Sequence, residues 1–262
     1  MKYLIIGLIT LLFSTLTLLS GFGLGTVLMP VFALFFPLPL AIGGTAVVHL
    51  MNSLFQVSLV GNYANYSIVW RFGLPAILAS FVGASLLSLF SNFEPIFSQQ
   101  VGRLEINITV TGLIVGMMVI ISSLFELTSR AKSISFHSKY IPLGGLLSGF
   151  FGGLAGYQGA LRSAFLINAG LNTKQFIGTS AVCSVLVDMA RLLIYSFSAY
   201  KGDFGELKTI LPLLVMACLT SLLGSYLGSK LMHKIAFRSL QLLVGSMLFV
   251  LGFAIILGIG KR

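Results

Sequence analysis

Apolar residues fill this chain in eight long blocks, and no more than a loop separates each block from the next. The blocks cover residues 3–36, 38–60, 67–90, 104–127, 139–170, 174–199, 207–232 and 237–260. About 20 apolar residues are enough for a helix to cross the hydrocarbon core of a bilayer. Only 8% of the residues are charged, against about 25% in an ordinary soluble domain. The pattern therefore predicts an all-α polytopic membrane protein.

We expect residues 1–262 to form a single membrane domain, because no connection is long enough to hold a soluble one. The first block resembles a signal peptide but lacks a small-x-small cleavage site, so we interpret it as a retained first span. The formal net charge is +10, and most Lys and Arg residues lie between the blocks or close to their ends. In that position they orient a membrane protein and meet lipid headgroups. The expected partners are the bilayer and a small solute, and not nucleic acid.

The two halves of the chain share a pattern that indicates a duplication. Blocks one and five are too long for one straight span, and glycine-rich stretches interrupt both, SGFGLGTVLMP at 20–30 and SGFFGGLAGYQGALR at 148–162. A Gly-Thr pair follows in the next block of each half, at 44–45 and at 178–179. We predict repeat one at about 1–127, a basic loop at 128–139 and repeat two at about 140–262. Each repeat has about four spans, and its first span is broken at glycines.

The second block of each half carries a stripe of polar residues. After its glycine, polar side chains recur at relative positions 0, 4, 8 and 11, which lie on one face of a helix. The stripes are Thr45, His49, Ser53 and Gln56 in the first half, and Ser180, Ser184, Asp188 and Arg191 in the second. Asn52 and Thr179 flank them. Two such stripes beside two helix breaks predict one cavity between the halves, as in secondary transporters.

The second stripe contains two charges at membrane depth. Each charge costs about 2.5–3.5 kcal/mol at the centre of a spanning helix, but Asp188 and Arg191 are three residues apart and can pair. The pair has two interpretations, one purely structural. In the other, Arg191 contributes to an anion site while Asp188 sets its field or carries a coupling proton. His49 is a second candidate for coupling, because histidine changes charge near neutral pH, although a lone buried histidine is often only a hydrogen-bonded core residue.

The glycine breaks and Arg162 also favour an anion. A half-helix that begins at a break directs backbone N–H groups and a positive dipole end into the gap, which makes Gly23, Gly25 and Gly153 candidate contacts. The alternative is close helix packing, because Gly149-x-x-x-Gly153 fits the small-xxx-small rule. Arg162 either extends to the lipid interface or fixes a positive charge near the break, where an oxyanion can take a bidentate contact. Tyr157 and Gln158 supply neutral donors beside it.

Enzyme and metal functions find little support in the sequence. Asp188 is the only acid well inside a block, and no G-x-S-x-G motif marks a nucleophile. His137 and His233 fall between blocks without ligand-spaced neighbours. Cys183 and Cys218 lie within apolar blocks and fit packing residues better than a disulfide or metal pair. We therefore expect no enzymatic activity, no metal and no cofactor.

The side of the membrane on which the termini lie depends on the broken blocks. If the eight blocks simply alternate, the positive-inside rule favours cytoplasmic termini. If blocks one and five each fold back as two half-helices, the assignment changes.

The glycine motifs resemble a known family. The stretch at 20–30 with its Gly-x-Gly-x-Gly, the later Gly44-Thr45, GGLAG at 152–156 and IGTSAV at 177–182 are similar to the signatures of the TauE/SafE sulfite exporter family. The continuation GYQGALRS is more polar than is usual there. The resemblance implies a multi-pass permease of the bacterial or archaeal inner membrane. It further implies transport of sulfite or organosulfonates such as sulfoacetate, driven by the proton gradient.

These arguments together predict a secondary transporter of a small anion, bound between the two halves. A carrier for another small anion such as a carboxylate, or an anion channel, is the alternative. The predicted substrate-binding residues are His49, Asn52, Gln56, Thr45, Gly23, Gly25, Gly153, Gln158, Arg162, Thr179, Ser180, Ser184 and Arg191. The predicted proton-coupling residues are Asp188 and His49.

Overall fold

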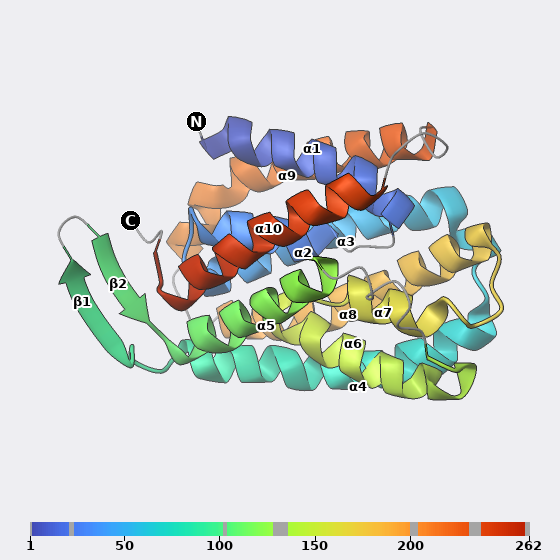
Figure 1. Ribbon diagram of the computed structural model, residues 1–262, viewed down its shortest axis with the longest axis horizontal. Coiled ribbons are helices and arrows are strands. Elements are labelled where there is room, and N and C mark those ends of the chain that lie inside the picture. Colours follow the sequence, from blue (N-terminus) through green and yellow to red (C-terminus); the bar gives the residue numbers. More distant parts are fainter. Residues whose placement is uncertain are drawn as a thin grey trace.

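The computed structural model describes residues 2–20, 24–101, 104–127, 136–199, 204–230 and 237–259, and these form a bundle of long helices (Figure 1). The α-helices are α1 (Lys2–Ser20), α2 (Leu24–Ala33), α3 (Leu38–Val60), α4 (Tyr66–Ser91), α5 (Val110–Leu127), α6 (Ile141–Ala155), α7 (Gly159–Leu166), α8 (Thr173–Ala199), α9 (Phe204–Lys230) and α10 (Phe237–Ile256). Short 3-10 turns precede α4 and α6, at Gly61–Tyr63 and Ser138–Tyr140. By length and composition, α3, α4, α8 and α9 are each able to cross a membrane. The all-α polytopic prediction is confirmed.

The two longest blocks each divide into two helices that contact one another, a point that the sequence analysis left open beside the predicted glycine breaks. In the second half, α6 ends at Gly156, whose φ of 83° lies in the left-handed region that favours glycine. The chain then turns back through Gln158 into α7. In the first half, α1 ends at Ser20 and α2 begins at Leu24, and the predicted site residue Gly23 lies outside the described residues. Blocks one and five are therefore folded-back helix pairs rather than straight spans.

Close contacts at glycines show the direction in which neighbouring helices pack. In α6, Gly145, Gly149 and Gly153 lie directly against the backbone of Phe72, Ala76 and Ser80 in α4, so these two helices run parallel. In α9, Gly224 lies against Ser14 and Gly228 against Thr15 in α1, so that pair is parallel as well. By contrast, α5 and α10 cross antiparallel, with Gly116 against Gly252. Only residues without a Cβ permit backbones to approach this closely.

The order of helices in the first half recurs in the second half with the opposite direction. Gly178 near the start of α8 meets Val60 at the end of α3, so these two helices are antiparallel. Because α1, α3 and α9 run one way and α4, α6 and α8 the other, each helix of one half opposes its counterpart. If α1 to α5 are matched in order with α6 to α10, the α1–α9 contact corresponds to the α6–α4 contact. The α3–α8 and α5–α10 contacts each join a helix to its own counterpart.

A β-hairpin that the sequence analysis did not predict joins α4 to α5. Strand β1 (Phe97–Val101) pairs antiparallel with β2 (Leu104–Ile108), with Gln99 opposite Ile106. Residues 104–108 are thus a strand and not the start of a helix, which begins at Val110. The signal was present, because isoleucine alternates with polar residues through LEINI at period two. The backbone N–H of Asn107 donates to the Leu257 carbonyl at 3.1 Å, which connects the hairpin to the segment after α10.

The bundle has two ends that are used below. The hairpin end, on the left of Figure 1, holds the hairpin, the start of α1 and the end of α10. The far end, on the right, holds the end of α3 and the starts of α4, α6 and α8. The α1–α2 pair extends inward from the hairpin end and the α6–α7 pair from the far end. We call the inner end of each pair, where its two helices join, its tip. The two tips meet within the bundle, where Gly25 lies against the Gly156 carbonyl.

Candidate functional site

A cluster of buried polar side chains lies where the two tips meet α3 and α8. We call it the charge cluster: His49 from α3, Gln158 and Arg162 from the start of α7, and Asp188 and Arg191 from α8. Each of these side chains is at most 5% exposed. The cluster therefore draws on both halves, and both guanidinium groups lie inside the bundle rather than at its surface. Sequence analysis had singled out all five residues.

Asp188 is the centre of the cluster. His49 Nδ1 lies 2.5 Å from Asp188 Oδ2, and Gln158 Nε2 donates to Oδ1 at 2.9 Å. Arg191 Nε donates to Oδ1 at 2.9 Å, which confirms the pairing that the three-residue spacing predicted. Both carboxylate oxygens thus have charged or polar partners, as a carboxylate out of water requires.

Glycine is required where the tips approach Arg191 and His49. A Cβ at Gly156 would lie 2.9 Å from Arg191 Nη1, and one at Gly25 would lie 3.3 Å from the Gly156 carbonyl oxygen. The Gly25 position also contacts the His49 ring, whose Cδ2 would be 3.5 Å from such a Cβ. Arg191 Nη1 is 3.5 Å from the Gly152 carbonyl oxygen. The glycine-rich breaks thereby bring backbone from both halves against the charged side chains.

Arg162 is the cation that the cluster leaves without an acid. Its Nη1 donates to Gln158 Oε1 at 3.4 Å, and its Nε has no hydrogen-bond partner. Among the described residues no carboxylate forms an ion pair with it, since Asp188 pairs with His49 and Arg191. Two arginines and one aspartate give the cluster an excess of one positive charge with His49 neutral. Burying such a charge without a partner is costly, so an anion would be stabilised here.

Unpaired hydrogen-bond donors gather on the same elements. Of five buried side-chain atoms without a partner in the described structure, four belong to the tips and α8: Thr26 Oγ1, Arg162 Nε, Ser180 Oγ and Arg191 Nη2. Arg191 Nη2 lies 2.7 Å from Asp188 Oδ1, which makes an ion pair without hydrogen-bond geometry. Tyr157 Oη donates to the Thr26 carbonyl at 3.2 Å and links the two tips. All four atoms belong to groups that can donate, which suits a ligand that only accepts.

Other predicted residues make local contacts instead of joining the cluster. Thr45 Oγ1 donates to the Ala41 carbonyl at 2.6 Å, and Thr179 Oγ1 accepts from the Asn65 amide at 2.9 Å. Asn52 Oδ1 accepts from Ser225 Oγ in α9 at 2.6 Å. Ser184 is buried without a described hydrogen bond, and Gln56 is half-buried.

Gly153 packs against the backbone of Ser80 in α4. Close helix packing was the alternative interpretation of this glycine in the sequence. Its carbonyl also accepts from Tyr195 Oη. Tyr195, Thr26 and Gly156 were not predicted as site residues. Their signals were local: Tyr195 follows Arg191 by four residues on the same helix face, and Thr26 and Gly156 belong to the glycine motifs.

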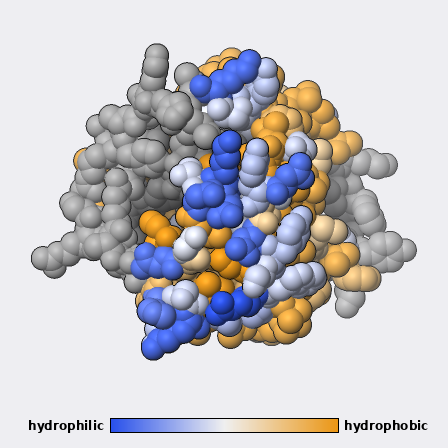
Figure 2. Space-filling model, turned by 90° about the vertical axis from the view of Figure 1, so that its right-hand side faces the viewer, coloured by the Kyte–Doolittle hydropathy of each residue, from blue (hydrophilic) through white to orange (hydrophobic). Residues whose placement is uncertain are grey.

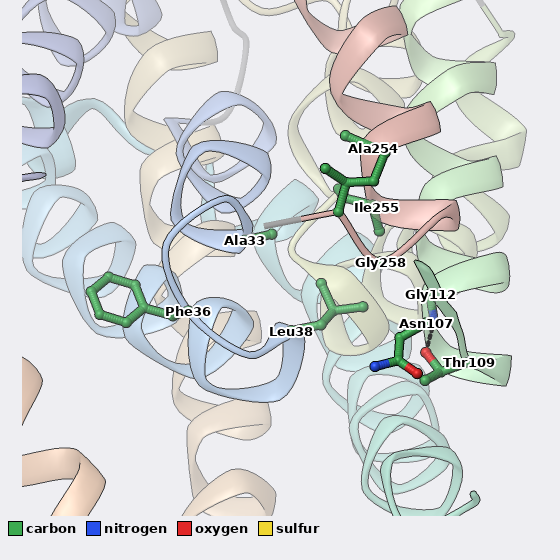
Figure 3. A pocket seen from close by; sticks show the side chains of 10 residues that line it. Ala33, Phe36, Leu38, Asn107, Thr109, Gly112, Ala254, Ile255 and Gly258 are labelled. Carbon is green, nitrogen blue, oxygen red and sulfur yellow. Dashed lines mark hydrogen bonds between the residues drawn. The ribbon is translucent and has the colours of Figure 1, made fainter. Parts of the chain in front are cut away.

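A separate shallow groove, with a free volume of only about 20 Å³, lies at the hairpin end and not at the charge cluster. Figure 3 shows its lining, which comes from the end of α2, the start of α5 and the end of α10. Ala33, Leu38, Ala254 and Ile255 make it largely apolar, and the Thr109 hydroxyl is already used by the Gly112 amide at 3.0 Å. We assign no ligand to it.

Comparison with known proteins gives one match. The family model described as sulfite exporter TauE/SafE matches residues 6–255, nearly the whole chain. No curated protein and no solved structure matches the chain.

Proposed function

This chain belongs to the TauE/SafE sulfite exporter family of membrane transporters, and from that premise we propose that it is a secondary transporter of sulfite or a small organosulfonate in the cell inner membrane. The observation that carries the proposal is Arg162, a buried cation without an acid in the described structure, together with unpaired donors on the tips and on α8. A small oxyanion neutralises the excess charge and accepts these donors, and charge-assisted hydrogen bonds are the strong ones.

In this proposal Arg162 makes the primary contact with the anion. Arg191 already donates to Asp188 through Nε, so only its Nη2 group is left to contact the anion. Nη2 and the hydroxyl groups of Thr26 and Ser180 are the secondary donors. Gly25 and Gly156 allow backbone to approach the anion, and Gln158 holds Arg162 and Asp188 at fixed separation through its two amide ends. The predicted roles of Thr45, Asn52, Gln56, Thr179 and Gly153 are not needed for this site.

The inverted arrangement of the halves supplies a route for transport. One folded-back helix pair reaches the charge cluster from each end of the bundle, and the described structure buries the cluster from both. We propose that the two halves arose by duplication, at about 1–127 and 140–262, and that they rock about the α3–α8 contact to open the cluster to one side at a time. The matching pattern of helix contacts supports this division.

The His49–Asp188 pair is our candidate for proton coupling. His49 Nδ1 in α3 lies 2.5 Å from Asp188 Oδ2 in α8. Because this contact joins the two halves, its strength affects the stability of the interface between them. A proton on His49 makes the contact a charged pair, and loss of the proton weakens it. Binding and release of that proton thus couple to the movement that exposes the anion.

Arg162→Gln in proteoliposomes tests the proposed site. Losing a charge-assisted contact worth about 1.5–3 kcal/mol lowers sulfite affinity by about tenfold or more. We expect sulfite to raise the melting temperature of the wild type by mass action and not that of the variant, and uptake driven by a pH gradient to fall in parallel. Arg71→Gln, at an exposed arginine, is the matched control. Unchanged uptake and an unchanged thermal shift in Arg162→Gln would refute the assignment.

The same thermal-shift screen separates the alternatives. Sulfite and sulfonates should stabilise the protein more than sulfate or carboxylates at equal concentration. A carboxylate as the best stabiliser would replace the substrate class, and a steady anion current across a planar bilayer would show a channel instead of a carrier.

A further inference from the structure

The far end of the bundle is chemically unlike the hairpin end. Among the exposed charged side chains that the structure describes, all four cations, Arg71, Lys139, Lys174 and Lys230, lie at the far end. The single exposed acid of that set, Glu94, lies at the hairpin end. Figure 2 looks onto the far end and shows hydrophilic residues gathered over its centre, with hydrophobic surface mainly to their right. The molecule is therefore polarised along the membrane normal.

Aromatic side chains accompany the cations at the far end. Lys174 Nζ lies 5.1 Å from the centre of the Tyr63 ring, Lys139 Nζ 4.9 Å from that of Tyr140, and Lys230 Nζ 4.4 Å from that of Tyr226. Trp70 is 60% exposed one residue before Arg71. Exposed Trp and Tyr rings are enriched at the boundary between lipid and water, with Lys and Arg among the headgroups. The far end thus has the composition of a membrane interface.

The connections between helices carry the same asymmetry in sequence. Segment 128–135 precedes α6, which starts at the far end, and segment 231–236 follows α9, which ends there; they add Arg130, Lys132 and Lys234 with no acid. Segments 92–109 and 200–203 join helix ends at the hairpin end, and they carry two cations and three acids. The charges there are Arg103, Lys201, Glu94, Glu105 and Asp203. Basic connections remain on the cytoplasmic side during insertion.

We infer that the far end lies at the cytoplasmic leaflet, where Arg71, Lys139, Lys174 and Lys230 contact the headgroups of anionic phospholipids. That leaflet has a negative surface potential, which complements the four cations. The hairpin and both described ends of the chain then face the other side of the membrane. Simple alternation of eight blocks favoured the opposite orientation, because it counted blocks one and five as single crossings. Block one instead folds back, which exchanges the sides of the connections between blocks one and five, and the fold-back of block five restores the sides of the later ones.

Cysteine accessibility tests the orientation without any transport assay. Cys183 and Cys218, the two native cysteines, are replaced by serine. Single cysteines are then introduced as Asn62→Cys at the far end and Gln99→Cys in β1, both at exposed positions. With a membrane-impermeant maleimide on spheroplasts, we expect Gln99→Cys to react at once and Asn62→Cys only after lysis. The reverse result would overturn the inference, whatever the transported anion.

Lipid preference tests the proposed partner. In nanodiscs of phosphatidylglycerol the wild type should melt at a higher temperature than in nanodiscs of phosphatidylcholine. We expect the variant with Arg71→Gln, Lys139→Gln, Lys174→Gln and Lys230→Gln to lose most of that difference. Glu94→Gln at the hairpin end is the control and should keep it. A quadruple variant that retains the full difference would show that these cations do not contact anionic lipid.

Discussion

Helices α3 and α8 occupy corresponding places in the two halves, yet they contribute different chemistry. In α8, Asp188 and Arg191 both enter the charge cluster, together with Arg162 from the preceding tip. In α3 only His49 does so, because Thr45 bonds to its own helical turn and Asn52 to Ser225 of α9. All the permanent charges of the cluster thus come from the second half.

This difference makes the charge cluster asymmetric although the helix contacts of the two halves correspond. The second half supplies Arg162, Asp188 and Arg191, and the first half supplies His49, which contacts Asp188 across the α3–α8 interface. Asymmetry follows from energetics, because each further buried charge needs its own partner. A second Asp–Arg pair on α3 would add that cost without adding excess positive charge for an anion.

Arg191→Leu is the change in α8 with the largest expected effect. It leaves Asp188 with His49 and Gln158 alone, and breaking a buried pair by removing one partner costs about 3–5 kcal/mol. We expect uptake to be abolished and the melting temperature to fall, with the protein still inserted in the membrane. Uptake equal to wild type in proteoliposomes would remove Arg191 from the site, and Lys174→Leu at the exposed far end is the control.

His49→Gln is the corresponding change in α3. Glutamine keeps a hydrogen bond to Asp188 but cannot take up a proton near neutral pH, so binding should persist while coupling is lost. We expect the sulfite-induced thermal shift to change little. Gradient-driven uptake should fall by about tenfold, which corresponds to a free-energy change of roughly 1.4 kcal/mol. The pH dependence of uptake should flatten. If it keeps its wild-type shape, His49 is a structural partner of Asp188 only.

Gly156→Ala tests whether the second tip needs its left-handed residue and its open approach to Arg191. A non-glycine residue there costs about 1–2 kcal/mol, and its Cβ would lie 2.9 Å from Arg191 Nη1. We expect a lower melting temperature and uptake reduced several-fold. Gly170→Ala is the matched control, because φ is 72° there but nothing lies within 4 Å of its Cβ position. Equal loss of uptake in both variants would assign the effect to backbone strain alone.

Asn52→Ala should have the smallest effect on transport. It leaves the buried Ser225 hydroxyl without its acceptor, which costs about 1–3 kcal/mol of stability, but it touches neither Asp188 nor Arg162. We expect a lower melting temperature with sulfite affinity unchanged. A loss of affinity comparable to that of Arg162→Gln would mean that both polar stripes bind the anion and that the two halves are more alike than the structure indicates.

Local patterns gave much of this fold correctly. Hydrophobic blocks predicted the spanning helices, the glycine stretches predicted the two breaks, and the spacing of Asp188 and Arg191 predicted their pairing. The β-hairpin was missed because a short alternating stretch was attached to the apolar block that follows it. These outcomes depend on neighbours within a few turns of chain, which is the range over which periodicity carries information.

Contacts between distant residues were beyond such reasoning. Whether Gly153 lines a site or packs against α4 depends on Ser80, and whether Asn52 faces an anion depends on Ser225, which is 173 residues away. The sequence marked both as site candidates because glycine and asparagine suit either role. It likewise ranked Arg191 beside Arg162, and only the pairing of Arg191 with Asp188 shows which cation is left in excess.

The sequence by itself determined that this chain fills a bilayer with helices, breaks two of them at glycine and buries ionisable groups in α8. Hydropathy and backbone freedom are properties of single residues and short segments, so they can be read without coordinates. Tertiary structure alone decided that Gly25 meets Gly156, that His49 reaches Asp188 from the other half and that the exposed cations among the described residues gather at one end. Each of these results depends on the direction in which whole helices pack, and that direction is set by the sum of many distant contacts.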